Sequence, residues 1–114
     1  MYLLHGNPKA AFHRIEQQLN KTKNQADVYR LLGQLSIGIR EYARGIEYLE
    51  KAIVLNPDLS SAYFLIGNAY AAQNKFDSAI EQYEKVSKKS PQAVQPLMMV
   101  GMLYDMKKTA AESQ

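Results

Sequence analysis

Apolar residues recur three and four positions apart along most of the chain, which is the spacing of residues on one face of a helix. Clear examples are Ile46, Leu49 and Ile53, and then Ile80, Tyr83 and Val86. No window of the sequence keeps the alternation of apolar and polar residues that a β-strand requires. The pattern therefore predicts six helices, at about residues 8–21, 25–38, 42–55, 59–72, 76–88 and 93–107.

Polar or helix-breaking residues separate these segments. The run AQNK at 72–75 is typical of a turn between two helices. Pro57 and Pro91 disfavour the helical state in the residues before them, so each is expected to end a helix. Asn7 is a suitable cap for the first helix, because Pro8 follows it at the first helical position.

The predicted helices repeat with a period of 34 residues, which places Gly33, Gly67 and Gly101 in register. One shift aligns Tyr29 with Tyr63, Leu32 with Ile66, Gly45 with Ala79, Leu49 with Tyr83, Ala52 with Val86 and Pro57 with Pro91. Further shifts align Leu97 with Tyr63, Val100 with Ile66, Tyr104 with Tyr70, Tyr2 with Tyr70, Ala11 with Ala79, and Ile15 with Tyr83. Small residues let two helices approach closely, so Gly67 and Ala79 are predicted to face each other.

This pattern resembles the tetratricopeptide repeat (TPR) family of helix–turn–helix units. The positions that carry the resemblance are Tyr29, Gly33, Tyr63, Gly67, Tyr70, Ala79, Tyr83, Gly101 and Tyr104. It implies an all-α fold, an α-solenoid of antiparallel helix pairs that winds into a right-handed superhelix. We expect one array over 1–114, with complete units at 26–59 and 60–93 and partial units at 1–25 and 94–114.

The first complete unit departs from the second at two positions. Ser36 stands where the second unit has Tyr70, and Gly45 stands where it has Ala79. We expect these smaller residues to loosen the local packing.

Composition excludes several classes of protein. The chain has no cysteine, which rules out disulfides and thiolate chemistry and fits a reducing compartment. The start lacks the features of a signal peptide, and the longest apolar block, at 97–104, is too short to span a bilayer. A cytoplasmic location is therefore favoured for this segment, although a longer parent protein could be exported or anchored. The net charge of +3 forms no basic stripe, so we expect no nucleic-acid partner.

Three groups of residues could carry chemistry, and each has a simpler explanation. His5 and His13 are separated by Gly6 and Pro8, so they do not share a helix face as metal ligands would. The carboxylates of Asp77, Glu81 and Glu84 are expected to form a solvated helix face. Ser36 lies between glycines but inside a predicted helix, whereas a nucleophilic serine of that kind needs a strand-to-helix turn. We therefore predict no catalysis, metal or cofactor.

The family resemblance implies instead a binding groove, lined by the first helix of each repeat. The positions that would face it are Asp27, Arg30 and Gln34; Ser61, Phe64 and Asn68; and Gln95, Met98, Met102 and Met106, with Leu31, Leu65 and Met99 at its shoulder. The expected partner is a peptide or a helix of another protein. The methionines form an apolar strip that either binds such a partner or packs against a further helix; both interpretations stay open.

One subgroup of the family binds acidic chaperone tails through a lysine three residues before the glycine and an asparagine after it. Asn68 follows Gly67, but Phe64 stands at the lysine position. Arg30 stands at that position in the first unit, where Gln34 replaces the asparagine. The sequence therefore departs from that subgroup.

The register of the two termini suggests a segment of a longer array. Tyr2 aligns near the end of a first helix, and Ser113 aligns near the start of a second. We expect the last helix to present Leu97, Val100 and Tyr104, and the first to present Phe12, Ile15 and Leu19, to helices that the chain does not supply. Head-to-tail self-association would follow, with a swapped dimer or a monomer as alternatives.

A different alternative is that the repeats present substrates to a larger enzyme, such as a glycosyltransferase. Some such enzymes carry groove asparagines at regular intervals. Here Asn68 aligns with Gln34 and Met102, so the regular series is absent.

Overall fold

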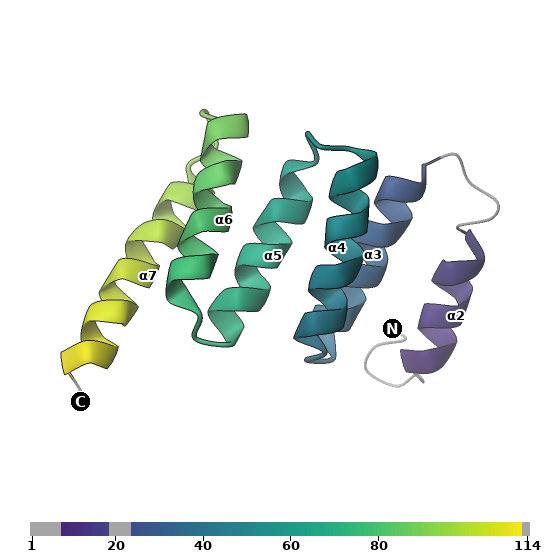
Figure 1. Ribbon diagram of the computed structural model, residues 1–114, viewed down its shortest axis with the longest axis horizontal. Helices are drawn as coiled ribbons and strands as arrows, with labels where there is room; N and C mark the ends of the chain where they lie inside the picture. The colour runs from purple at the N-terminus through teal and green to yellow at the C-terminus, as the bar shows by residue number, and fades with distance from the viewer. Residues whose placement is uncertain (1–7, 19–23, 113–114) are drawn as a thin grey trace. The chain divides into compact units, whose positions relative to one another are not determined.

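The computed structural model describes residues 8–18 and 24–112 of the chain, and it is helical in these segments, with no strand (Figure 1). The helices are α2 (Pro8–Gln18), α3 (Gln25–Gly38), α4 (Tyr42–Leu55), α5 (Ser60–Ala72), α6 (Phe76–Lys89) and α7 (Gln95–Glu112). They form two compact units, Met1–Pro57 and Asp58–Gln114. The predicted all-α fold of paired helices, of the TPR-like solenoid class, is confirmed.

The predicted bounds hold for α3 and α4, and they differ by one residue for α5 and α6. Two predictions were wrong for α7, which begins at Gln95 rather than 93 and continues to Glu112 rather than 107. It begins late because a turn precedes it, in which the Ala93 amide donates to the Ser90 carbonyl at 3.0 Å. For α2, the predicted residues 19–21 lie outside the described part of the chain.

The late end of α7 is accompanied by a different backbone conformation at the turn position of the repeat. Arg40 and Asn74, which are 34 residues apart, both adopt positive φ, at 66° and 62°. Each ends the first helix of a pair and turns the chain into the second. Lys108 stands at the next position of this series but is helical, so α7 continues past the point where α3 and α5 stop.

In the unit 1–57, α3 packs along α4, and two glycines set their separation. A β-carbon added to Gly33 would lie 2.6 Å from Leu49 Cγ, and one added to Gly45 would lie 2.9 Å from the Gly33 carbonyl oxygen. Both positions therefore exclude any larger residue unless the helices move apart. The expectation that Gly45 loosens the packing was wrong, because its missing side chain is what allows the two backbones to approach.

The remaining core of this unit lies between α2 and α3. Phe12 is buried in a cluster with Val28, Leu32 and Leu35, so the expectation that Phe12 is presented to a missing helix was wrong. Ser36 is fully buried as well, and its hydroxyl donates to the Leu32 carbonyl at 2.8 Å. This bond satisfies the polar group of a small residue within the helix.

In the unit 58–114, α6 packs between α5 and α7. Ala79, Ile80 and Tyr83 form a buried cluster with Leu103 of α7. Phe64 of α5 packs against the same cluster, with its ring 5.3 Å from that of Tyr83. Among the aromatic residues at repeat positions, Tyr83 is therefore part of the core of this unit and Tyr70 packs against it, whereas Tyr104 is exposed.

Candidate functional site

Gly101 of α7 differs from the glycines at equivalent positions of α3 and α5. A β-carbon on Gly33 or Gly67 would collide with a residue of the following helix, whereas one on Gly101 would meet no atom within 4 Å. Gly101 is also exposed. In the described part of the chain, α7 therefore lacks the helix that covers the equivalent face of α3 and α5.

The most conspicuous surface feature of the unit 58–114 is a set of exposed large apolar side chains on α7. Their exposed fractions are 59% for Leu97, 62% for Met98, 54% for Met102, 53% for Tyr104 and 45% for Met106. By helical spacing they form two rows. We call Met98, Met102 and Met106 the methionine stripe, and Leu97, Gly101 and Tyr104 the glycine face.

The opposite side of α7 holds it in the unit. Leu103 is buried, and Met99 and Val100 pack partly against the same cluster. The expectation that Val100 is presented to a missing helix was therefore wrong, whereas Leu97 and Tyr104 are exposed as predicted. Near its other end, Lys107 Nζ lies 2.6 Å from Asp77 Oδ1 of α6, and this hydrogen bond raises the pKa of Lys107.

The predicted groove residues of α5 are partly engaged within their own unit. Phe64 and Asn68 are both half-buried, and the Tyr83 hydroxyl donates a hydrogen bond to Asn68 Oδ1. Burial raises the pKa of Tyr83 to about 12. The side-chain oxygen of Asn68 therefore takes part in the contact between α5 and α6. The spacing of Asn68 in the sequence did not predict this role.

In the unit 1–57 the predicted groove residues are polar. Asp27 accepts a hydrogen bond from Asn24 at 2.5 Å and lies 3.9 Å from Arg30. Both are half-buried, whereas Gln34 and Leu31 are exposed. On the first helix of its pair, this unit therefore presents a charged pair beside one leucine.

A tyrosine–lysine pair recurs at the same repeat positions in both units and was not singled out from the sequence. Lys51 Nζ lies 5.8 Å from the centroid of the Tyr29 ring, and Lys85 Nζ lies 5.9 Å from that of Tyr63. These are cation–π distances. The 34-residue shift relates both members of the pair, so the repeat itself could have revealed it.

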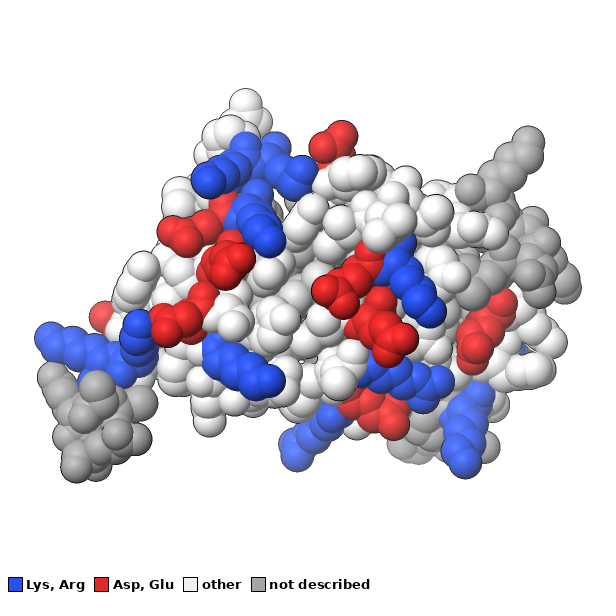
Figure 2. Space-filling model, viewed as in Figure 1, with Lys and Arg blue, Asp and Glu red and all other residues white. Residues whose placement is uncertain are grey.

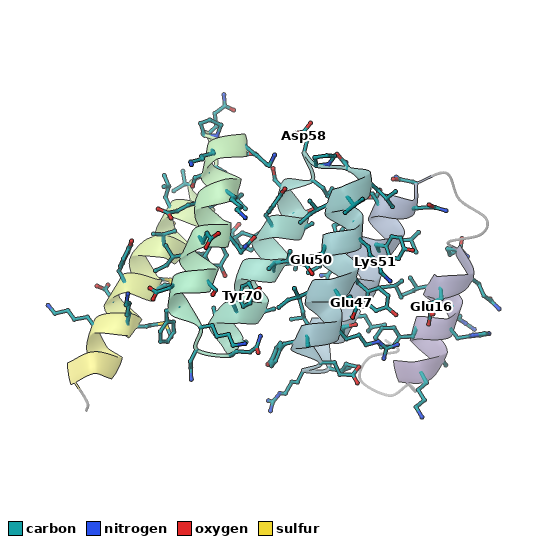
Figure 3. The ribbon with its side chains drawn as sticks, viewed as in Figure 1. Glu16, Glu47, Glu50, Lys51, Asp58 and Tyr70 are labelled. Carbon is teal, nitrogen blue, oxygen red and sulfur yellow. The ribbon has the colours of Figure 1, made fainter. Side chains whose placement is uncertain are left out.

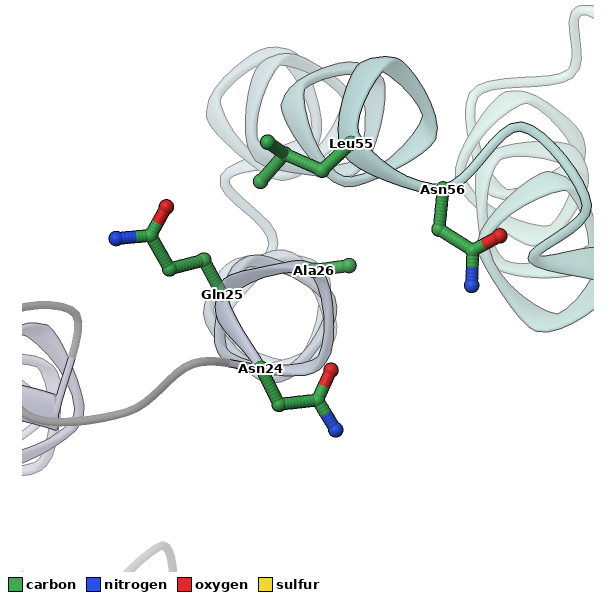
Figure 4. Close-up of a pocket in the computed structure, with 5 residues that line it drawn as sticks. All are labelled: Asn24, Gln25, Ala26, Leu55 and Asn56. Atoms are coloured by element: carbon green, nitrogen blue, oxygen red, sulfur yellow. The ribbon is translucent and has the colours of Figure 1, made fainter.

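Two adjoining hollows lie at one end of the unit 1–57. The larger, of about 310 Å³, is lined by Asn24, Gln25, Ala26, Leu55 and Asn56 (Figure 4). The smaller, of about 250 Å³, shares Gln25 and Leu55 and adds Tyr29, Lys51 and Val54. The linings of the two hollows together combine amide groups, aliphatic groups and the ammonium of Lys51.

Charged residues of both signs are interspersed on the face shown in Figure 2. Figure 3 labels Glu47, Glu50 and Lys51 on α4, so this helix carries acidic and basic side chains together. On the visible face no large area carries charges of one sign.

The residues considered for chemistry have structural neighbours instead. His13 is exposed and hydrogen-bonds Gln17 at 3.2 Å, and His5 lies outside the described residues. Asp77 pairs with Lys107, and Glu81 lies 3.8 Å from Lys85. Within 8–18 and 24–112, no helix has the length and apolarity needed to cross a bilayer, and no three potential ligands gather around a metal position.

Comparison with known families agrees with this geometry. Two models described as tetratricopeptide repeat match residues 26–59 and 60–93, which together make up more than half of the chain. The chain belongs to the TPR family. TPR repeats generally form non-catalytic scaffolds, and the chain is accordingly a scaffold for protein–protein interaction.

Two curated proteins are similar in sequence. The mouse protein O-mannosyl-transferase TMTC1 is 32% identical over 79 residues, which is 66% of this chain but 8% of that protein. The bovine BBSome complex member BBS4 is 28% identical over 105 residues, which is 91% of this chain and 20% of that protein. The chain thus spans a small part of the length of either relative.

Solved structures share the fold. The crystal structure of MamA superimposes with a TM-score of 0.81 at 29% identity, covering 94% of this chain and 63% of that one. The first TPR domain of human RPAP3 gives a TM-score of 0.83 at 17% identity, covering 99% of this chain and 89% of that domain. At this identity, the second comparison concerns the fold alone.

Proposed function

We propose that the chain binds a segment of a partner protein through the first helices of its repeats, with α7 supplying the apolar anchor points. The observation that carries the proposal is the methionine stripe, whose three side chains are each about half exposed or more. Methionine is flexible and polarizable, so a row of methionines adapts to apolar side chains of different shapes. A helix or extended segment with two or three apolar anchors would suit it.

The other predicted groove residues would contribute recognition rather than apolar area. In the unit 58–114, Phe64 and Asn68 are half-buried, so their remaining surface is available to a ligand. In the unit 1–57, the Asp27–Arg30 pair and the exposed Gln34 offer charged and amide groups. We propose that each unit uses these residues to select the partner segment that it binds.

The similarity to BBS4, a member of a multi-protein complex, supports a partner that is a protein rather than a small molecule. This similarity extends over 91% of the chain.

The test is a selection of binders from a library of displayed 16-residue random peptides, followed by titration of one selected synthetic peptide. Met102→Lys places a charge in the middle of the stripe and should weaken binding at least about tenfold. Val54→Lys is the matched control, because Val54 is also an exposed apolar residue, 79% exposed, but lies on α4. It should leave the affinity unchanged.

Chemical-shift mapping gives an independent readout. The selected peptide should perturb the amides around Met98, Met102 and Met106 and those of Phe64 and Asn68. Perturbations centred on the outer surface of α4 or α6, near Glu47 or Glu81, would contradict the proposal, as would equal effects of the two lysine substitutions.

A second candidate function is that the repeats hold an acceptor polypeptide for a glycosyltransferase. The 32% identity to a protein O-mannosyl-transferase favours it. O-linked transfer acts on hydroxyl groups, so this function predicts that the selected peptides are enriched in serine and threonine. Enrichment in leucine, phenylalanine and methionine without hydroxyl residues would favour the first function instead.

A further inference from the structure

The glycine face of α7 is the half of an interface that occurs twice elsewhere in the chain. In the unit 1–57 the side chain of Leu49 lies over Gly33, and in the unit 58–114 the ring of Tyr83 lies over Gly67. Gly101 stands at the same repeat position and has nothing over it. Leu97 and Tyr104, one turn to either side, are 59% and 53% exposed.

The helix α2 carries the other half of that interface. Its residues are in register with those of α4 and α6, so that Ala11 corresponds to Gly45 and Ala79, and Ile15 to Leu49 and Tyr83. Ala79, Leu49 and Tyr83 are fully buried beneath the first helices of their pairs. Ala11 and Ile15 pack partly against the Phe12 cluster of their own unit. Both are only half-buried there, so the rest of their surface remains accessible.

We propose that α2 of a second copy of this chain docks on the glycine face of α7, with Ile15 over Gly101 and Ala11 beside the Gly101 carbonyl, as Gly45 lies beside the carbonyl of Gly33. The second copy would thereby supply the helix that pairs with α7, as α6 pairs with α5. This inference goes beyond the proposed function, because it uses the glycine face rather than the methionine stripe, although the two adjoin at Met98.

Such a contact joins two different surfaces, so it is heterologous. Each docked copy offers its own α7 to the next, and association continues until a ring closes or a filament forms. The expected behaviour is therefore a weight-average mass that keeps rising with concentration, rather than a plateau at the mass of a dimer.

Sedimentation equilibrium of residues 1–114 tests the proposal. Gly101→Leu fills the close-approach position and should weaken association at least about tenfold. Gly38→Leu is the matched control, since a β-carbon at Gly38 also meets nothing within 4 Å. It should leave association unchanged. Because both glycines have open space, both variants should keep the helical circular dichroism of the parent.

A complementation experiment tests the identity of the occupant. Ala11→Glu should block the docking face of α2, and Ala10→Glu, at an exposed neighbour, should not. Ala11→Gln replaces the glutamate variant if the latter loses helical signal. Gly101→Leu and Ala11→Glu should each be monomeric alone. Mixed together, they should form a 1:1 dimer that does not grow, because only one intact α2 and one intact α7 remain.

Several outcomes would overturn the proposal. A chain that stays monomeric at high micromolar concentration would do so, as would association that Gly101→Leu leaves intact. A mixture of the blocked variants that stays monomeric would show that the intact α2 of one variant does not dock on the intact α7 of the other, and it would also overturn the proposal. Peptide binding by a monomeric chain would leave the proposed function standing, so the two proposals fail separately.

Discussion

The ring of Tyr83 lies so close to Gly67 that a β-carbon added to the glycine would be 2.7 Å from Tyr83 Cε1. Tyr83 is fully buried, so its ring has no open space into which it could retreat. The same ring contacts Phe64 and donates a hydrogen bond to Asn68. Tyr83 of α6 thus contacts three residues of α5, which are Gly67, Phe64 and Asn68. These contacts fix the positions of Phe64 and Asn68, two of the residues proposed to bind a partner.

Gly67→Ala should therefore destabilise the chain by about 1–3 kcal/mol, because the extra carbon overpacks the crossing of α5 and α6. Gly101→Ala is the matched comparison, because its β-carbon meets open space. It should leave stability unchanged or raise it by up to about 1 kcal/mol, since alanine favours a helix over glycine. Urea denaturation followed by circular dichroism measures both. Equal effects at the two positions would show that Tyr83 does not constrain Gly67.

Gly45→Ala gives a sharper test, because alanine is the residue at the equivalent position 79 of the other unit. A repeat-consensus argument predicts that the substitution is harmless or stabilising. The structure predicts a loss of about 1–3 kcal/mol, since the new carbon would lie 2.7 Å from Ile37 Cγ1 and 2.9 Å from the Gly33 carbonyl oxygen. The midpoint of urea denaturation distinguishes the two expectations, and a midpoint at or above that of the parent would contradict the structure.

Tyr83→Phe keeps the ring over Gly67 but removes the hydrogen bond to Asn68. We expect a loss of about 1 kcal/mol at neutral pH, because the half-buried amide oxygen of Asn68 loses its donor. Tyr104→Phe serves as the control, because Tyr104 is exposed and its hydroxyl remains hydrated in either state. Indistinguishable denaturation midpoints for the two variants would mean that the Tyr83 bond contributes nothing measurable.

The raised pKa of Tyr83 predicts a dependence of stability on alkaline pH. Burial raises this pKa from 10.0 to about 12, so the folded chain retains the phenol proton over a range in which the unfolded chain releases it. The stabilisation is fully present below pH 10 and is lost as the pH rises toward 12, by an amount on the order of 2 kcal/mol. The difference in stability between the parent and Tyr83→Phe should therefore shrink or reverse across that range. A constant difference would contradict the assigned burial.

The contact of Lys107 with Asp77 should hold the end of α7 against α6. Asp77→Asn should speed amide hydrogen exchange in residues 103–109, whereas Glu81→Gln, on the same helix, should not. Both carboxylates are exposed, so the effect should disappear at about 1 M salt, where charges are screened within about 3 Å. Unchanged exchange in Asp77→Asn at low salt would show that α7 is held by Leu103 and its apolar neighbours alone.

The sequence by itself determined the class of fold and most helix bounds. Helical spacing, prolines and the 34-residue register were sufficient, because each position in the repeat requires its residue type for a local physical reason. The two complete units show the same residue types at equivalent positions, which makes the pattern recognisable. The same register placed Gly33, Gly67 and Gly101 at equivalent positions. It predicted that Ala79 faces Gly67, whereas the atoms nearest to a β-carbon at Gly67 belong to Tyr83.

Only the tertiary structure decided which of those positions have a partner. Gly67 and Gly101 are equivalent in sequence, yet one lies beneath Tyr83 and the other faces open space. Likewise, spacing gives Lys108 the place of Arg40 and Asn74, yet Lys108 is helical whereas the other two adopt positive φ. Contacts between helices depend on the residues that lie opposite each side chain. The position of a residue in the repeat does not determine those opposing residues.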